Sequence, residues 1–478
     1  MKRPMTAALV AALVLVAACG DSDDGEDAAP TTTSGTATTG GTATTAPEVT
    51  DPVDILFGPV STSAVPDPLE CSMKAGVIVG RKGAQPDPEL ATPLEEVDEE
   101  SELDITQAEV DRLAADPSDF QIFVLTDPAT NPLDVARESV DLSPVYVYGF
   151  GGHVVFIPAS GARPETAGPT ALPYAAPGEG LLGIVDSGLD RRFQLDGVDA
   201  VGPNGDPYLD PSLDRDVDVD VSDPSWPAAG HGTFIASLVR QLPGAPEVVM
   251  TAARLGEHTV TDGVVANGQK VSGTTAGWSV YAAIVRLADA LEQREAIGAP
   301  LSLSLVTEKC EGEDAFLLDA ALQYWRDKEP QLGPIFAGAG NGSDSSQMEP
   351  ALYPGASPDV TAVGAVGWNG RRADFSNEGE QWAPGVCLVA DRGPSFGGVS
   401  AWSGTSFATP LAAAGNSDEY EPLGQQMGRR LDEATRGECG AEEDDQEPLH
   451  LPPTTTSPTT SSPSSTTEPP TEEGGEDG

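Results

Sequence analysis

Gly404-Thr405-Ser406-Phe407-Ala408-Thr409-Pro410 is the stretch of this sequence that most restricts the fold. A serine stands here among small residues, which suits a tight turn at the start of a helix. Two stretches far upstream have the same character: Val185-Asp186-Ser187-Gly188 and Gly230-His231-Gly232-Thr233. Together they offer an aspartate, a histidine and a serine. Nucleophilic serine chemistry needs these three types: an alcohol that attacks, an imidazole that takes its proton, and a carboxylate that orients the imidazole.

From Leu181 onward, apolar runs that suit buried strands alternate with segments of helical periodicity. We expect strands at 181–185, 248–253, 301–305 and 335–337. Helices are expected around 280–291, where apolar residues recur every three or four positions, and at 315–325. Alternation of this kind predicts an α/β fold with a mostly parallel sheet flanked by helices. Functional residues collect at the carboxyl ends of parallel strands, and Asp186 and Asn341 both follow predicted strands.

The motifs give the chain from about 181 to 435 a resemblance to the subtilisin-like serine proteases, or subtilases. Asp186 matches the family's Asp-Ser/Thr-Gly motif, His231 its His-Gly-Thr motif, and Ser406 its Gly-Thr-Ser-x-Ala-x-Pro motif. A fourth match is Ala339-Gly340-Asn341; the family's Asn at this place donates to the oxyanion. The resemblance implies a subtilisin-like fold and a serine endopeptidase that works through an Asp-His-Ser triad and an acyl-enzyme.

Each of these residues has a structural explanation when it is taken alone. Asp186 suits a turn or a cap, His231 a helix start, and Ser406 an N-cap. Their joint occurrence in the family's order favours a protease site. The alternative is a catalytically silent binding or scaffold lipoprotein with the subtilase fold.

Substrate backbone is usually gripped by strand edges in this family, and by position 302–307 and 337–340 would line that cleft. The sequence also departs from the family's pattern. Phe234 and Ser237 stand where a second His and a Gly are common, and the first cleft segment runs into Glu308-Lys309-Cys310 rather than a Gly-rich stretch. We therefore expect altered packing behind the site and leave the specificity open.

The first residues resemble a bacterial export signal. Lys2 and Arg3 precede a short apolar core, about ten residues long, which is too short to span a bilayer. Val16-Ala17-Ala18-Cys19-Gly20 resembles a lipoprotein box, in which Cys19 would be lipidated; an ordinary signal peptide is the alternative. The predicted destination is the outer face of the bacterial cell membrane, or secretion. The lipid is the one membrane attachment that we expect.

The predicted organisation has five parts. They are a signal peptide at 1–18, a disordered Thr/Gly-rich tether at 19–50, an α+β unit at 51–172, the catalytic domain at 173–440, and a disordered acidic Pro/Thr/Ser tail at 441–478. In the α+β unit we expect a helix at 105–115, a strand at 120–125, and a hairpin of strands 145–148 and 153–157. By position and size this unit resembles a subtilase propeptide, which would be cut within 158–180; a retained N-terminal extension is the alternative.

Four cysteines besides Cys19 suggest two disulfides in an exported chain. They are Cys71, Cys310, Cys387 and Cys439, which allow three pairings. Their scattered spacing argues against a zinc site. A disulfide from Cys71 to the catalytic domain would hold the pieces together after the predicted cut.

The charge balance restricts the partners. The chain has 76 acidic and 25 basic residues, a formal net charge of −51. Such a charge argues against binding to nucleic acid or to an anionic membrane surface. We expect protein or peptide substrates, a monomer, and no required cofactor. An acidic loop could supply oxygen ligands for Ca²⁺, although a solvated loop is the default; its members are Asp206, Asp210, Asp214, Asp216, Asp218, Asp220 and Asp223.

Overall fold

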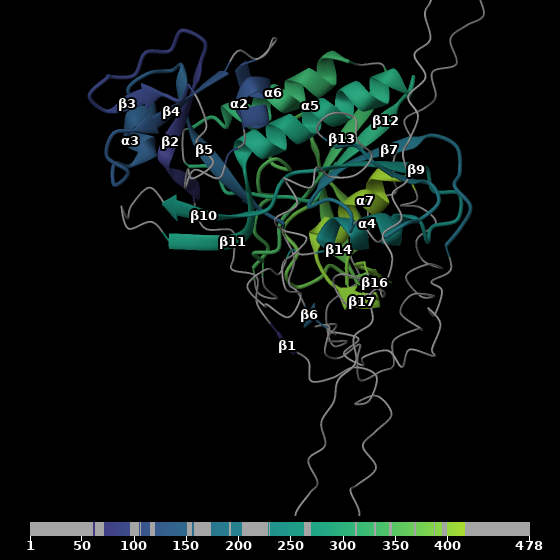
Figure 1. Cartoon of the computed structure of the whole chain (residues 1–478). Coiled ribbons are helices and arrows are strands. Elements are labelled where there is room, and N and C mark those ends of the chain that lie inside the picture. The colour runs from purple at the N-terminus through teal and green to yellow at the C-terminus, as the bar shows by residue number, and fades with distance from the viewer. Residues whose placement is uncertain are drawn as a thin grey trace, which may run out of the picture. The chain divides into compact units, whose positions relative to one another are not determined.

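A computed structural model gives the fold of the chain (Figure 1). It describes residues 61–62, 71–95, 105, 107–114, 120–150, 155–156, 174–190, 193–202, 228, 230–261, 269–310, 313–328, 331–343, 347–367, 370–386, 388–393 and 399–415. The predicted signal peptide, tether and acidic tail lie outside these residues, as do Cys19, Cys387, Cys439 and the acidic loop. No helix in the described part is long and apolar enough to cross a membrane.

A parallel sheet of seven strands forms the centre of the structure. Its order is β15-β14-β13-β12-β7-β9-β8, and every neighbouring pair is parallel. The strands are β7 (Leu181–Asp186), β8 (Val198–Ala200), β9 (Glu247–Ala252), β12 (Ala299–Leu303), β13 (Leu332–Gly338), β14 (Thr361–Val366) and β15 (Gln381–Pro384). The predicted parallel sheet is therefore confirmed.

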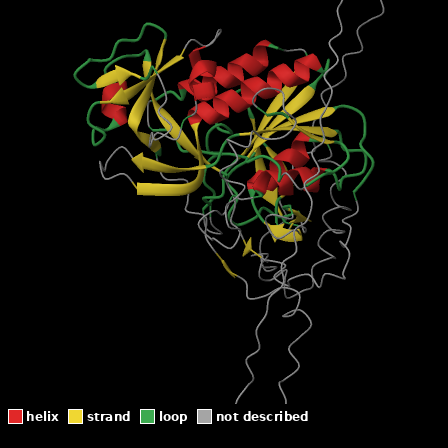
Figure 2. Cartoon of the chain, in the orientation of Figure 1, coloured by secondary structure: helices red, strands yellow, loops and turns green. Residues whose placement is uncertain are grey.

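Helices cover both faces of this sheet. In Figure 2, α5 (Gly277–Gln293) and α6 (Phe316–Asp327) lie together along one face. On the other face lie α4 (His231–Val239) and α7 (Thr405–Ala413). Successive residues of a strand point to opposite faces, so β7 contributes to two separate cores. Val185 belongs to the cluster that includes α5 and α6, and Ile184 to the cluster that includes α4 and α7.

A second sheet, antiparallel in every pairing, joins the early part of the chain to a later hairpin. Its order is β10-β11-β5-β2-β4-β3. The strands are β2 (Met73–Arg81), β3 (Ala91–Pro93), β4 (Phe120–Leu125), β5 (Leu142–Gly149), β10 (Gly256–Thr261) and β11 (Gln269–Ala276). Two helices accompany it, α2 (Gln107–Ala114) and α3 (Pro132–Ala136). The predicted propeptide-like unit and the predicted catalytic domain thus share one sheet.

The hairpin predicted from strands 145–148 and 153–157 does not form. β5 pairs with β2 and β11, whereas β6 (Val155–Phe156) pairs with β1 (Ser61–Thr62). The reason lies in the burial of β5, which is buried along almost its whole length and takes a central place between two other strands. A further short antiparallel pair, β16 (Leu388–Asp391) with β17 (Val399–Trp402), precedes α7.

Several contacts fasten the early part of the chain to the rest. A disulfide joins Cys71 to Cys310, with the Cα atoms 4.5 Å apart. An ion pair of 2.8 Å joins Arg112 of α2 to Asp289 of α5. Burial alone would raise the pKa of Asp289, but hydrogen bonds from Tyr324 and Arg112 outweigh it and lower that pKa below its ordinary value. The pair is therefore ionised at neutral pH.

The disulfide predicts the behaviour of a chain that is cut once between residues 158 and 173. With a site-specific protease site inserted there, the cut protein should run as one species on a non-reducing gel and as two under reduction. The matched control is Cys71→Ser, which should separate into two fragments on both denaturing gels. Two fragments from the unmutated chain without reductant would contradict the prediction.

Candidate active site

Asp186 is the last residue of β7, and its side chain is fully buried. Its Oδ1 accepts hydrogen bonds from Ser187 N at 2.7 Å and from His231 Nδ1 at 2.8 Å. Asp186 Oδ2 is buried and finds no hydrogen-bond partner within the described ranges. The carboxylate is thus held by its own turn and directed at the imidazole.

His231 begins α4, and the glycines around it allow it to approach Asp186. Gly230 precedes the helix with φ +77°, in the left-handed region that favours glycine. An added Cβ at Gly232 would lie 2.4 Å from Gly188 O and 3.1 Å from Asp186 Oδ1. A side chain at position 232 would therefore push the start of α4 away from the end of β7. The Gly-His-Gly pattern of the sequence has this steric cause.

The two ring nitrogens of His231 differ in their hydrogen bonding. Because Nδ1 donates to the carboxylate, Nε2 is the ring's acceptor. Nε2 is buried and has no hydrogen-bond partner among the residues that the structure describes. Among the described residues, three aromatic rings surround the imidazole, with centroids 5.0 Å (Phe407), 5.5 Å (Trp402) and 5.6 Å (Phe150) away. The vacant nitrogen is available to take a proton inside an aromatic shell.

Ser406 lies in the first turn of α7 and forms a reciprocal pair with Ser304. Ser406 Oγ donates to Ser304 O at 3.1 Å, and Ser304 Oγ donates to Ser406 O at 2.7 Å. The alternation Leu301-Ser302-Leu303-Ser304-Leu305 is the signal by which the sequence could have pointed to Ser304. Ser304 falls within 302–307, which was expected to line the substrate cleft, but its bond to Ser406 was not anticipated.

Asn341 follows β13 and is fixed by the start of α7. Its Oδ1 accepts from Thr405 N at 2.9 Å, which leaves the amide nitrogen Nδ2 buried and without a partner. Gly340 has φ +106°, and its N–H donates to Thr405 Oγ1 at 3.2 Å. The amide therefore presents a hydrogen-bond donor that nothing in the described part of the chain uses.

The structure thus brings the sequence-predicted residues into one buried site at the carboxyl ends of parallel strands. Asp186, His231, Asn341 and Ser406 are each no more than 7 % exposed. Phe150 was missed by the sequence reasoning and reaches this site from the early part of the chain. No group of three or more His, Cys, Asp or Glu side chains that could hold a metal occurs among the described residues.

Comparison with known proteins names the family of this region. Residues 179–416 match a family model described as "Subtilase family". This part of the chain is a subtilase domain. Subtilisin E of Bacillus subtilis (strain 168) is 39 % identical over 98 residues, which are 20 % of this chain and 25 % of that protein. A subtilisin of Bacillus pumilus has the same identity over the same length, which is 34 % of its sequence. The matched stretch therefore spans only a quarter to a third of these relatives.

Solved structures of similar proteins include the prenylagaramide maturation protease PagA and a cold-adapted subtilisin-like serine proteinase. The first has 20 % identity and a TM-score of 0.34, covering 53 % of this chain and 78 % of the other. The second has 19 % identity and a TM-score of 0.32, covering 52 % and 76 %.

The two departures of this subtilase domain behind its histidine have clear packing roles. Phe234 packs its ring against Trp402 and Phe407, with both centroids 4.9 Å away, and extends the aromatic shell of His231. Ser237 Oγ accepts from Asp391 N at 2.9 Å and is also 3.0 Å from Tyr174 Oη. Both residues act in packing and hydrogen bonding behind His231, and neither takes the place of Asp186, His231, Asn341 or Ser406.

The reciprocal Ser304–Ser406 pair predicts a difference between two neighbouring serines of the subtilase domain. Ser304→Ala leaves the buried carbonyl of Ser406 without this donor, so the free energy of unfolding should fall by about 1–3 kcal/mol. Ser302→Ala is the matched control, because Ser302 Oγ is buried without a partner in the described part of the chain, so its loss removes no hydrogen bond seen there. Urea unfolding measures both; equal losses in the two variants would contradict the prediction.

Proposed function

We propose that this chain is a serine endopeptidase that hydrolyses peptide bonds through Asp186, His231 and Ser406. The observation that carries the proposal is the 2.8 Å hydrogen bond from His231 to Asp186, with His231 Nε2 left buried and vacant. A base that is oriented on one side and vacant on the other is what an attacking alcohol requires. The subtilase-family match of residues 179–416 supports the same reading.

Ser406 would act as the nucleophile after a rotation of its side chain. Its hydroxyl leaves Ser304 O, donates to His231 Nε2 and attacks the scissile carbonyl, while the imidazole takes the proton. The imidazolium then protonates the leaving amine, and an acyl-enzyme remains on Ser406 Oγ. Water, deprotonated by the same imidazole, releases the acyl group. Asp186 stabilises the charged imidazolium in both steps.

The tetrahedral oxyanion would be stabilised by Asn341 Nδ2 and by the backbone N–H of Ser406. Asn341 presents an unused donor beside the start of α7. The first turn of a helix supplies free N–H groups and a favourable dipole for an anion. Donors that are fixed before the reaction stabilise the developing charge without reorganisation.

A catalytically silent subtilase-fold binding protein is the competing function. The observation that favours it is the hydrogen bond from Ser406 Oγ to Ser304 O, which leaves His231 Nε2 without a partner. Reaction of Ser406 with an electrophilic probe separates the two functions, because a serine reacts readily only when a neighbouring base activates it.

The decisive experiment is labelling of the whole chain with a fluorophosphonate probe. We expect labelling of the unmutated protein and none of Ser406→Ala. Ser357→Ala is the matched control: it removes a serine outside the site and should label normally. Absence of Ser406-dependent labelling in folded protein would overturn the protease proposal and leave the binding function.

Asn341→Leu tests the oxyanion role separately. Its side chain is of similar size but has no donor, so kcat should fall by about 10²–10³, a magnitude established on a subtilisin itself. KM should change little, because the donor acts mainly in the transition state. Peptide hydrolysis measured alongside thermal unfolding checks this; a rise in KM at unchanged kcat would contradict the assignment.

We further infer that the protein is exported and works outside the cytoplasm, held at the cell surface through lipidated Cys19. The positively charged start, the short apolar core and the cysteine at its end support this inference. Protein or peptide substrates would then be met at the outer face of the membrane.

A further inference from the structure

The end of β5 lies between two segments of the subtilase domain and is hydrogen-bonded to both. Gly149 N donates to Val306 O, and Val306 N donates to Gly149 O, both at 2.9 Å. On the other edge, residues 147–149 pair antiparallel with residues 274–276 of β11. Thr307 Oγ1 adds a hydrogen bond to Val147 O at 2.9 Å. An extended peptide that adds a strand to exposed edges is bound by contacts of this kind.

Residues 147–150 end beside His231, the proposed catalytic base. Phe150 is buried, and its ring centroid lies 5.6 Å from that of His231. The stretch 302–307 was expected to grip substrate backbone, and its Val306 grips Gly149 instead. The chain's own residues 147–150 therefore occupy the position in which a peptide would run into the triad.

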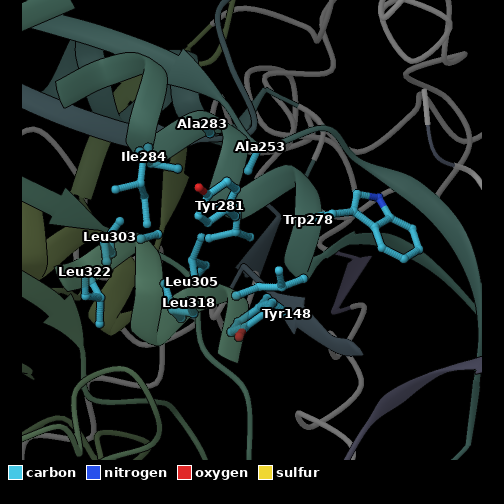
Figure 3. Close-up of a cluster of buried hydrophobic side chains, with 14 of the residues drawn as sticks. Tyr148, Ala253, Trp278, Tyr281, Ala283, Ile284, Leu303, Leu305, Leu318 and Leu322 are labelled. Atoms are coloured by element: carbon cyan, nitrogen blue, oxygen red, sulfur yellow. The ribbon is translucent and has the colours of Figure 1, made fainter. Parts of the chain in front are cut away.

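Tyr148 is the second aromatic anchor of the segment. It stands two residues before Phe150, and both rings belong to the same buried cluster. Figure 3 shows Tyr148 beside Leu305 and Leu318 in the buried cluster. An added Cβ at Gly277, the first residue of α5, would lie 3.6 Å from the Tyr148 ring. The ring is thus enclosed by α5, α6 and Leu305, which follows β12.

Gly149 between the two aromatics faces open space. A Cβ added at this position would meet no atom within 4 Å, and its φ is not in the left-handed region. A residue with any side chain could therefore take this place without a clash. We call the place of residues 147–150, between residues 274–276 and Val306, the active-site groove. It has two enclosed positions, at 148 and 150, separated by one open position at 149.

We propose that the active-site groove selects peptides with the pattern aromatic, any residue, aromatic, and that the second aromatic lies on His231. Residues 148–150 mark the three positions. The inference rests on the proposed protease function and adds the class of substrate to it. Burial of two aromatic rings supplies the selectivity, and the backbone pairing with residues 274–276 and 306 supplies the register.

Four quenched fluorogenic peptides test the pattern. The parent carries Val-Tyr-Gly-Phe-Gly-Gly, the order found in this chain, and three variants replace its Tyr, its Phe or its middle Gly with Ser. The Tyr and Phe replacements should each lower kcat/KM by about 10-fold or more, because each removes a buried ring. The Gly replacement is the matched control and should stay within about twofold of the parent.

The enzyme for this test is the full chain with Phe150→Ala, which removes the chain's own aromatic from His231. Its kcat/KM for the parent peptide should rise several-fold over the unmutated chain. Val140→Ala, on an 89 % exposed side chain of the same early part, should leave kcat/KM unchanged. If Phe150→Ala does not fold, the unmutated chain serves instead. Its internal segment competes equally with all four peptides and preserves their ratios.

The outcomes separate this inference from the protease proposal. Equal kcat/KM for all four peptides, with Ser406-dependent fluorophosphonate labelling intact, would overturn the selectivity and leave the protease. If no labelling occurs, the protease proposal fails. Binding of the same four peptides to Ser406→Ala then tests whether the groove selects aromatic residues. Dissociation constants should rise about 10-fold for the Tyr and Phe replacements alone; four equal constants would overturn the inference.

Discussion

The hydrogen bond between Asp186 and His231 depends on a backbone contact that tolerates no side chain. The start of α4 comes so near the turn after β7 that a Cβ at position 232 would lie 2.4 Å from Gly188 O. This approach sets the imidazole against the carboxylate, with His231 Nδ1 at 2.8 Å from Asp186 Oδ1. The parallel sheet supplies the remaining geometry, because β7, β12 and β13 are neighbours and end at the same edge. Asn341 and Ser304 follow two of these strands.

The features that could be predicted from the sequence are those written in local patterns. Alternating strands and helices indicated the parallel sheet, and short Gly-rich motifs indicated Asp186, His231, Asn341 and Ser406. The pairing partners of β5 could not be predicted, because its apolar run suits any central strand and its neighbours lie more than a hundred residues downstream or far upstream. The contact of Phe150 with His231 follows from that pairing and was missed for the same reason.

The shared sheet changes how the early part of the chain relates to the subtilase domain. Strands β2 to β5 do not form a sheet of their own beside it; β10 and β11 continue the same ladder. The ion pair of Arg112 with Asp289 and the disulfide of Cys71 with Cys310 secure two other points. Unfolding of one part therefore exposes the edge strands and apolar surface of the other.

The disulfide also has a kinetic consequence for the groove. Because Cys71 is bonded to Cys310, residues 147–150 remain attached to the domain even where the chain is broken after them. A ligand that is tethered in this way binds intramolecularly, with an effective concentration set by the length and stiffness of the tether. A free peptide must exceed that concentration or bind more tightly to displace it. In a chain broken after residue 150, reduction of this disulfide would end the tethering, and strand pairing and the ion pair of Arg112 with Asp289 would then hold the segment without a covalent link.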